Sequence, residues 1–288
     1  MNIATRHGRR KNGTAPRLGV FGAGRAARTL AHLWHTAGVF EIGPLVNRSL
    51  ESARQAAGFI GVGFAAGTDD LKRSDIVLLG LPDSALADGA AQLAAAGVAP
   101  AVAFHLSAGD NAEVLAPLRA GGTAIGAVHP ALSFADPESA ARDFTGTYCL
   151  LDGDDRARRI LSSAFSAIGG ELLDGRGIDR RLYHAAAILA SNATVTIMAA
   201  AEALAAAAGL PAASARPLLA ALAARAVEQG AERGPDAALS GPFERGDQAA
   251  ITRLAAALPA TPAGRSASAL FVLLAEFAAQ RRVGKSAV

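Results

Sequence analysis

The sequence predicts an α/β fold with a doubly wound, mostly parallel sheet, followed by an all-helical region. From Arg17 to about Gly175, short and continuous apolar runs alternate with helical patterns. This alternation is typical of a parallel sheet that is covered by helices on both faces. After Ile178 the strand signal stops, and only helical patterns follow. We therefore predict an α/β domain over residues 17–175 and a helical domain over residues 176–288.

Each predicted strand of the first domain is a short apolar run, at 18–21, 43–46, 75–80, 101–104, 124–128, 148–151 and 171–173. The first predicted helix, Arg25–Ala37, precedes Gly38, which suits the left-handed cap at the end of a helix. A second helix is expected to begin at Ser49.

The helical region begins with one long predicted helix, Asp179–Gly209. Further helices are expected at about 214–230, 247–258 and 265–281, with a break at Gly241-Pro242. Helices this rich in alanine can pack closely, which suits the core of an interface between subunits.

The composition is that of a globular chain long enough for two domains. Of 288 residues, 51% are hydrophobic and 18% are charged. The net charge of +3 comes from a leader over residues 1–16, which holds no acidic residue. Without its Arg6, Arg9, Arg10 and Lys11, 24 basic side chains face 25 acidic ones. We expect the leader to be disordered. We expect the folded body to bind neither nucleic acid nor an anionic membrane.

The cysteine and histidine content gives no sign of a disulfide or a metal site. The single Cys149 excludes an internal disulfide and a cysteine-based zinc site. We expect it to be a small apolar residue of a buried strand. The six histidines lack the spacing of a metal-binding motif, so no metal is expected.

One apolar stretch, Leu182–Ala201, carries no formal charge and would nearly span a bilayer. It also contains polar residues that are costly in lipid, namely His184, Ser191, Asn192, Thr194 and Thr196. We interpret the stretch as a helix buried between protein elements, and we expect a cytoplasmic protein.

The segment Val20–Ala27 carries a dinucleotide-binding motif. Gly22, Gly24 and Ala27 satisfy G-x-G-x-x-G/A directly between a predicted strand and a predicted helix. The first glycine permits a tight turn, the second lets the backbone approach a pyrophosphate, and the alanine allows close helix–strand packing. The cofactor is expected to contact the residues at the start of this helix, which are Gly22, Ala23, Gly24, Arg25 and Ala26.

The end of the second predicted strand favours NADP over NAD. An NAD site would place Asp or Glu there for the ribose hydroxyls, whereas this sequence has Asn47, Arg48 and Ser49. The guanidinium of Arg48 can pair with a 2′-phosphate, and Ser49 can donate a hydrogen bond to it. NADP(H) is therefore the predicted cofactor, and a solvated arginine in an ordinary loop is the alternative.

Two further loops are expected at the edge of the sheet that borders the cofactor. Leu81, Pro82 and Asp83 follow the strand at 75–80. We expect them near the cofactor, although capping of the next helix is the favoured role for Asp83 and for Ser84. Ser107 follows the strand at 101–104. The hydroxyl of Ser107 would face the nicotinamide or the substrate. The alternative is that Ser107 is part of an ordinary turn.

Four pieces of the sequence together resemble a known family: Gly22–Ala27, Val128-His-Pro130, Leu182–Asn192 and Leu239–Asp247. In these pieces the chain is similar to Rossmann-like oxidoreductases whose C-terminal helical domain long had no known function. Their wider group includes 6-phosphogluconate, prephenate, ketopantoate and pyrroline-5-carboxylate enzymes. The resemblance covers nearly the whole chain after the leader. It implies a helical domain that contacts the substrate and forms a homodimer.

The resemblance to ketopantoate-type reductases places a candidate acid on the long helix. Those enzymes carry a catalytic Lys eight residues before an Asn-Pro, and the same count back from Asn192 gives His184. An imidazole can donate a proton or a hydrogen bond to a carbonyl as hydride arrives. The second polar position of that motif falls on Ile188, so the constellation is incomplete. On a regular helix, positions 184, 188 and 192 share one face. Ser191 lies beside that face and is expected to contact the substrate. Tyr183 faces away and is expected to pack.

Two more candidates come from the other pieces. His129-Pro130 resembles the His-Pro of prephenate and arogenate dehydrogenases, whose histidine contacts the substrate, and strand capping is the alternative. Arg245 follows Gly241-Pro242 and could hold a substrate carboxylate bidentately, with solvation as the alternative. Asp247 is expected to cap the next helix.

Together these features predict an NADPH-dependent oxidoreductase. The first hypothesis is reduction of the C=O group of a small 2-oxo acid, with ketopantoate the first to test. His129 or His184 would supply or orient the proton, while Asn192 and Ser107 would polarise the oxygen. The second hypothesis is reduction of a cyclic imine, as in pyrroline-5-carboxylate reductases. The third is a dinucleotide-sensing regulator without turnover.

Overall fold

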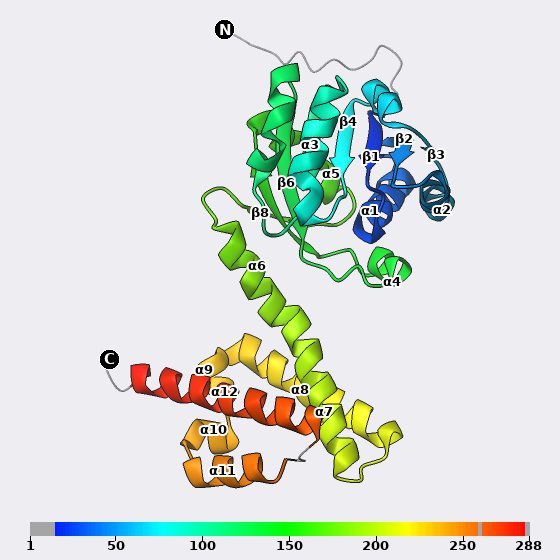
Figure 1. Ribbon diagram of the computed structural model, residues 1–288. Coiled ribbons are helices and arrows are strands. Elements are labelled where there is room, and N and C mark those ends of the chain that lie inside the picture. Colours follow the sequence, from blue (N-terminus) through cyan, green and yellow to red (C-terminus); the bar gives the residue numbers. More distant parts are fainter. Residues whose placement is uncertain (1–14, 259–260, 286–288) are drawn as a thin grey trace. The chain divides into compact units, whose positions relative to one another are not determined.

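The structure is a computed structural model in which residues 15–258 and 261–285 are described (Figure 1). The predicted leader lies outside these residues, apart from Ala15 and Pro16. The chain divides into two compact units, Met1–Ala187 and Ile188–Val288. The boundary falls within a helix, because the first turns of that helix bind residues of the first unit.

The first unit is built on one eight-stranded sheet with the order β3-β2-β1-β4-β5-β6-β7-β8 (Figure 1). In chain order the strands are β1 (Arg17–Phe21), β2 (Glu41–Val46), β3 (Phe64–Ala65), β4 (Ile76–Leu79), β5 (Val102–His105), β6 (Ala124–Pro130), β7 (Tyr148–Gly153) and β8 (Glu171–Asp174). Neighbouring strands run parallel except β6 and β7, which are antiparallel. The predicted doubly wound, mostly parallel sheet is confirmed.

Two strands differ from the expectation. β3 was not predicted, because its two residues are too few to form an apolar run. β6 continues past Val128 to Pro130, because its pairing with β7 continues there and sets His129 opposite Leu150. His129 therefore lies within the strand and not after it.

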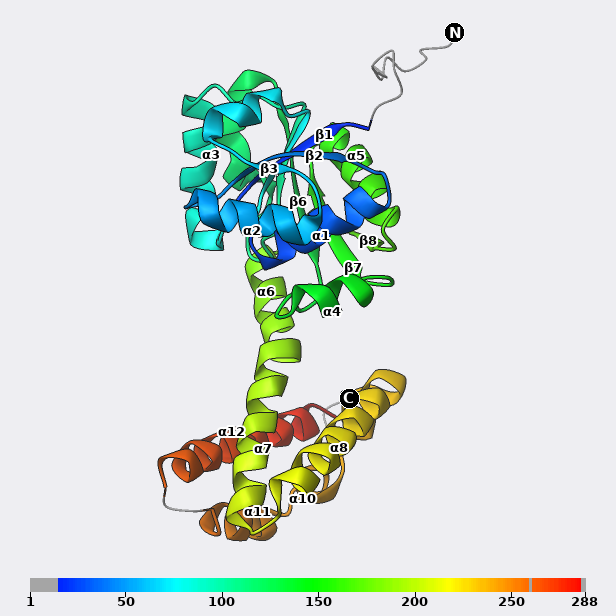
Figure 2. The same cartoon turned by 90° about the vertical axis from the view of Figure 1, so that its right-hand side faces the viewer.

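Helices cover both faces of the sheet (Figure 2), and a separate apolar core lies under each layer. One face carries α1 (Arg25–Thr36), α2 (Leu50–Ile60) and α5 (Asp155–Ser166), and the other carries α3 (Leu86–Ala95) and the 3-10 segment η3 (Ala112–Gly121). The connections include η1 (Thr68–Arg73), η2 (Asp83–Ala85) and α4 (Pro137–Arg142).

Side chains of the first core tie α1 to α5. The indole nitrogen of Trp34 donates to the carbonyl of Ala164 at 3.0 Å, and its ring packs edge-on against Phe165 at 5.2 Å. Cys149 is buried in β7 as predicted, and burial raises the pKa of its thiol to about 12. A neutral thiol in this place serves as a small apolar group.

The second unit is all helical over its described residues. The helix that crosses the boundary between the units begins as α6 (Arg180–Ile188) and continues through a π-helical segment, η4 (Leu189–Ala193), into α7 (Thr194–Ala207). The later helices are α8 (Ala212–Arg233), α9 (Pro235–Ala238), α10 (Gly241–Arg245), α11 (Gln248–Ala256) and α12 (Pro262–Lys285). The predicted long helix and the three helices after it are confirmed.

The helical pattern breaks at Leu239 and Ser240, directly before Gly241-Pro242, and this pair then begins the short helix α10. The reason is that proline fits the first turn of a helix, where its missing N–H has no partner to lose. Asp247 caps α11 as predicted, and its carboxylate accepts from the backbone nitrogen of Ala250 at 2.9 Å.

The long helix Arg180–Ala207 is apolar and, after Arg180, has no fully buried residue in its most apolar part. No residue in its most apolar 18-residue window is buried, and Leu182 is 72% exposed. The expectation of a helix buried between elements is therefore wrong for a single chain. By length and composition alone, this helix could cross a membrane. Several of its large apolar side chains stay exposed, among them Leu182, Leu189 and Val195.

Candidate functional site

The glycine-rich turn after β1 has a backbone that only glycine adopts without strain at its first position. Gly22 has a φ of +91°, and its backbone nitrogen donates to the carbonyl of Val46 at 2.7 Å. A Cβ atom there would lie 2.8 Å from the carbonyl oxygen of Gly80. The turn therefore fits tightly between the ends of β2 and β4.

A second contact, between α1 and the end of β4, is equally close. A Cβ atom on Gly80 would overlap the carbonyl oxygen of Gly22 and would come within 2.6 Å of Ala27 Cβ. The small residues at positions 27 and 80 thus let helix α1 pack against the sheet, which is the role expected of the third position of the motif.

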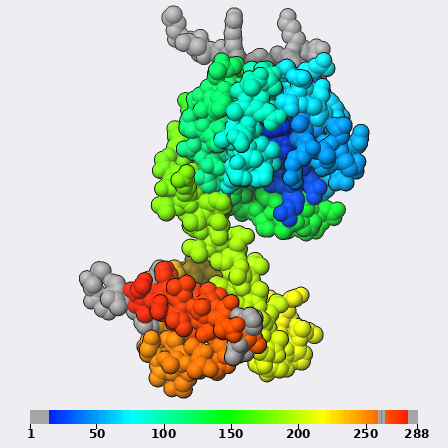
Figure 3. Space-filling view, viewed as in Figure 1, coloured from blue at the N-terminus to red at the C-terminus, as the bar shows by residue number. Residues whose placement is uncertain are grey.

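The start of α1 is open to solvent. Gly24 is its N-cap, with no side-chain cap and no acidic residue in the first turn, and Gly24 and Arg25 are exposed. The dark-blue segment that carries this turn reaches the surface of the first unit (Figure 3). A helix start with uncapped N–H groups suits an anionic ligand such as a diphosphate.

The other predicted members of the turn have different surroundings. Ala23 is buried, and its backbone nitrogen donates to the side-chain oxygen of Asn47 at 2.6 Å. Asn47 therefore holds the turn in place. Arg25 is exposed and donates to the carbonyl of Ala135 at 3.3 Å. Ala26 lies half-buried in the first turn of α1.

Arg48 and Ser49 follow β2 on the exposed surface. Ser49 caps α2, with its hydroxyl oxygen accepting from the backbone nitrogen of Ser52 at 3.2 Å. Arg48 forms no hydrogen bond or ion pair with the described part of the chain. Its guanidinium is thus the available cation beside the turn, as a 2′-phosphate site would need.

The loop after β4 does not cap the next helix, so the favoured role of Asp83 and Ser84 is wrong. Both residues lie inside the 3-10 turn η2, and α3 begins after it with Ala85 as its N-cap. Leu81 packs between the positions of Gly22 and Gly89. Pro82 and Asp83 are exposed beside it.

The loop after β5 is a tight turn organised by Ser107. Its hydroxyl oxygen accepts from the backbone nitrogens of Gly109 and Asp110, each at 3.1 Å, and donates to the Asp110 carboxylate at 3.3 Å. All hydrogen-bonding positions of the hydroxyl are therefore engaged. This geometry favours the turn role of Ser107 over contact with a substrate.

His105 supports the same turn from inside the sheet. It is fully buried, its Nδ1 accepts from the backbone nitrogen of Ser107 at 3.1 Å, and its Nε2 donates to the carbonyl of Asn111 at 3.0 Å. Burial is the main cause that lowers its pKa, to about 4. His105 is therefore a neutral structural histidine, a role that the sequence analysis did not foresee.

Arg180, the first residue of α6, binds the backbone of the turn of residues 107–110. Its Nε donates to the carbonyl of Asp110 and its Nη2 to the carbonyl of Ser107, each at 3.1 Å. The residue is only 4% exposed, and burial lowers the pKa of the guanidinium. No sequence pattern pointed to it, because an arginine at the start of a helix ordinarily lies in solvent.

His129 and Tyr183 form a polar pair between β6 and α6. His129 Nδ1 lies 2.7 Å from the Tyr183 hydroxyl, and the two rings meet edge to face at 5.5 Å. Burial is the largest cause that lowers the His129 pKa to about 4, followed by the charges of Arg180 and His184. Burial also raises the pKa of Tyr183. Tyr183 was expected only to pack, so its polar role is a correction.

His184 lies against the loop after β5. A Cβ atom on Gly109 would come within 2.9 Å of His184 Nδ1 and 3.7 Å of the Asp83 carboxylate. A side chain at position 109 would push the imidazole out of this position. The loops after β4 and β5 and the helix α6 thus meet around this point. Gly109 is a further site residue that the sequence analysis missed.

Three predicted site residues belong to the second unit. Ser191 donates to the side-chain oxygen of Asn192 at 3.0 Å, and both lie in the π-helical segment. This segment changes the spacing after Ile188, so His184 and Asn192 are not related by regular helical turns. Arg245 is exposed at the end of α10.

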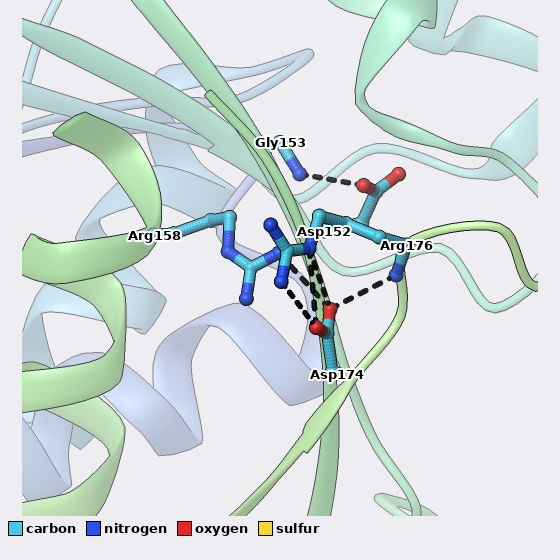
Figure 4. Close-up of polar contacts among 5 residues, drawn as sticks. All are labelled: Asp152, Gly153, Arg158, Asp174 and Arg176. Atoms are coloured by element: carbon cyan, nitrogen blue, oxygen red, sulfur yellow. Dashed lines mark hydrogen bonds and ion pairs between the residues drawn. The ribbon is translucent and has the colours of Figure 1, made fainter. Parts of the chain in front are cut away.

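A cavity of about 650 Å³ lies elsewhere on the first unit, beside α5 and β8. Its Asp174 carboxylate binds Arg176 at 2.7 Å and Arg158 at 3.0 Å (Figure 4). These arginines, Arg176 above all, hold the pKa of Asp174 well below its usual range. No predicted site residue is among its lining residues, so we do not include it in the candidate site.

Comparison with protein families confirms the resemblance drawn from the sequence. Residues 147–276 match the family described as "Domain of unknown function (DUF2520)". No curated protein matches the sequence.

Solved structures share the fold over most of the chain. BF3122 from Bacteroides fragilis, provisionally named an NADP oxidoreductase, is 22% identical, with a TM-score of 0.73 over 92% of this chain and 98% of its own. A reductive aminase from Aspergillus terreus, solved with NADPH and ethyl-5-oxohexanoate, is 18% identical, with 0.65 over 94% and 95%. A pyrroline-5-carboxylate reductase from Coxiella burnetii is 15% identical, with 0.57 over 92% and 98%. At these identities the likeness establishes the fold alone.

The low pKa of His105 makes folding sensitive to acid. Its folded-state pKa is about 4, below the ordinary value near 6.5, so between these values the unfolded chain binds the extra proton. We expect the free energy of unfolding to fall as the pH drops from 6.5 towards 5, by up to about 1.4 kcal/mol per pH unit for this residue. His105→Gln should flatten the dependence in urea titrations at several pH values.

The matched control is His35→Gln, because His35 is exposed at the end of α1. It should keep the wild-type slope. An unchanged slope in folded His105→Gln would contradict the assignment of His105 as a buried neutral histidine.

Proposed function

We propose that this chain, which carries a DUF2520 domain over residues 147–276, is an NADPH-dependent reductase of a small molecule with a C=O or C=N bond. One observation carries the proposal. The glycine-rich turn and the cluster of His129, Tyr183 and His184 belong to the same carboxyl edge of the sheet, beside the ends of β1 and β4–β6. In open α/β sheets this edge is where ligands bind.

The cofactor proposal rests on the residues around the turn. The uncapped start of α1 would hold a diphosphate through its backbone N–H groups, and the free guanidinium of Arg48 would bind a 2′-phosphate. Gly22 keeps the turn close to the sheet, and Asn47 holds it there. Bound in this way, NADPH would supply a hydride to the substrate.

For the substrate, reduction of the C=O group of a small 2-oxo acid remains the first hypothesis, and ketopantoate is the first compound to test. A cyclic imine is the second. It is favoured by the fold shared with a pyrroline-5-carboxylate reductase and a reductive aminase. In both reactions the carbon gains a hydride, the π bond breaks, and the oxygen or nitrogen gains a proton.

His184 is the proposed proton donor, because it lies against the loop after β5 at the carboxyl edge. His129 on β6 and Tyr183 on α6 would orient the substrate, since their short hydrogen bond fixes both rings. The proposed contribution of Asn192 to polarising the substrate, and the substrate contacts of Ser191 and Arg245, stay predictions of the sequence.

The test of the reaction is the loss of NADPH absorbance with a panel of 2-oxo acids and cyclic imines. We expect turnover with at least one compound, and we expect His184→Ala to lower kcat by roughly 10²–10⁴, as for loss of a general acid. His35→Ala is the matched control and should keep wild-type activity. Tight NADPH binding without turnover across the panel would instead indicate a dinucleotide-sensing regulator.

Cofactor choice is tested at Arg48. Replacing Arg48 with Ala should weaken NADPH binding by about 10- to 100-fold, because a charge-assisted hydrogen bond to phosphate is lost. NADH binding should hardly change, since NADH lacks that phosphate. Calorimetric titration with both nucleotides measures the difference. The control is Arg54→Ala, on the exposed side of α2, which should leave both affinities unchanged. Equal losses of NADPH and NADH affinity in Arg48→Ala would contradict the NADP assignment.

We further propose a cytoplasmic homodimer in which a second chain covers the helix Arg180–Ala207. The support is the exposure of large apolar side chains in the helical region, among them Leu182, Leu189, Leu218 and Leu222. Burial of such side chains on association is favourable. Burial of this helix by a second chain would also explain its apolar surface without a membrane.

Light scattering after gel filtration without detergent should therefore give twice the chain mass of 29.0 kDa. Leu189→Asp should shift the protein towards monomer, because a carboxylate would be placed in the apolar interface. Leu50→Asp, at an exposed leucine of the first unit, should remain dimeric. A monomeric wild type, or aggregation that only detergent relieves, would contradict this assembly.

A further inference from the structure

Arg180 is a buried cation without a carboxylate partner. Its side chain is 4% exposed, and it forms no ion pair within the described part of the chain. Two nitrogens are bound to the backbone carbonyls of Ser107 and Asp110. The third, Nη1, is buried and has no hydrogen-bond partner. An unpaired buried donor destabilises the fold, and more so when it is charged, so a ligand that accepts from this nitrogen would be stabilising.

None of the groups around Arg180 in the described part of the chain supplies an acceptor to Nη1. His129 and His105 are neutral at physiological pH, and the Tyr183 ring centroid lies 6.0 Å from the guanidinium carbon. The carboxylate of Asp110 accepts from Ser107. That of Asp152 accepts from the backbone nitrogen of Gly153 at 2.7 Å (Figure 4). The carboxylates of Asp152 and Asp110 interact with Arg180 only through space, and its Nη1 still lacks an acceptor.

We propose that Arg180 is the carboxylate-binding residue of the substrate site, with Nη1 as its donor. The inference rests on the proposed function and adds that the substrate carries a carboxylate next to the bond that is reduced. Two bonds to the turn of residues 107–110 fix the plane of the guanidinium before any ligand arrives, so little side-chain entropy is lost on binding. Arg180 lies on α6 one turn before the proposed donor His184.

Arg180 fits this role better than Arg245, which the sequence suggested. Arg245 is exposed, and an exposed guanidinium loses little by staying in water. Arg180 has already lost its water through burial, so a carboxylate gains the full value of a charge-assisted hydrogen bond there. Because Nη1 is closed to solvent, a carboxylate reaches it only if a neighbouring side chain moves. Tyr183 is the aromatic neighbour that the structure places against the guanidinium.

The experiment compares two small probes of the same shape, oxamate and oxamide, which differ in that oxamate has a carboxylate. Calorimetry with and without NADP⁺ should show oxamate binding about tenfold or more tighter than oxamide, in at least one of the two conditions. Arg180→Met should abolish this preference. Arg181→Met, at the exposed neighbouring arginine, should keep it. No preference in the wild type, or an unchanged preference in folded Arg180→Met, would overturn the inference.

A second measurement covers the case in which Arg180→Met does not fold, since Arg180 also holds the turn. The charge of Arg180 lowers the His129 pKa, so a carboxylate that neutralises this charge should raise it. Histidine-labelled wild-type protein, titrated by NMR with and without oxamate, measures the shift. Oxamate binding that leaves the His129 pKa unchanged would place the anion elsewhere and overturn the inference.

The two proposals fail separately. If the preference for oxamate depends on Arg180 but the protein never oxidises NADPH, the anion site is supported and the reductase function is rejected. Turnover of NADPH with equal kcat/KM for a 2-oxo acid and its amide would retain the reductase and reject the role of Arg180.

Discussion

The close approach of two backbone segments, at Gly22 and Gly80, is the constraint on which the rest of the site depends. No Cβ atom fits at either position, since each would meet the backbone of the other strand end. This contact fixes the start of α1 against the end of β4. The neighbouring ends of β5 and β6 then carry the Ser107 turn and His129 to the same edge. The cofactor turn and the polar cluster therefore share one rigid support.

Burial decides the charges of the cluster. The two histidines within the sheet are held neutral by desolvation, while the guanidinium of Arg180 keeps its charge and further lowers both their pKa values. The site holds one buried cation whose Nη1 has no acceptor, beside two neutral histidines. It suits a substrate that brings a negative charge and leaves a neutral polar bond to react. His105 and Ser107 belong to the support of this site because their polar atoms are bound within the turn.

The sequence predicted the sheet and the cofactor turn because both depend on local patterns: apolar runs, glycine spacing and a strand–helix order. It could not predict the two-residue strand β3 or the π-helical segment, which leave no periodic signal. Tyr183 was missed because its partner His129 lies 54 residues away in the chain. Arg180 was missed because burial of a charged residue is decided by tertiary contacts. The exposure of the long helix was missed because composition cannot say what covers an apolar face.

The most direct test of this account is a crystal structure of the protein grown with NADP⁺. We expect the diphosphate to contact the backbone N–H groups at the start of α1, from Gly24 to Ala26, with the 2′-phosphate at Arg48. The nicotinamide should lie at the carboxyl edge of the sheet, near the loop of residues 107–110. A nucleotide bound away from this turn, or a turn that stays empty at saturating NADP⁺, would contradict the account.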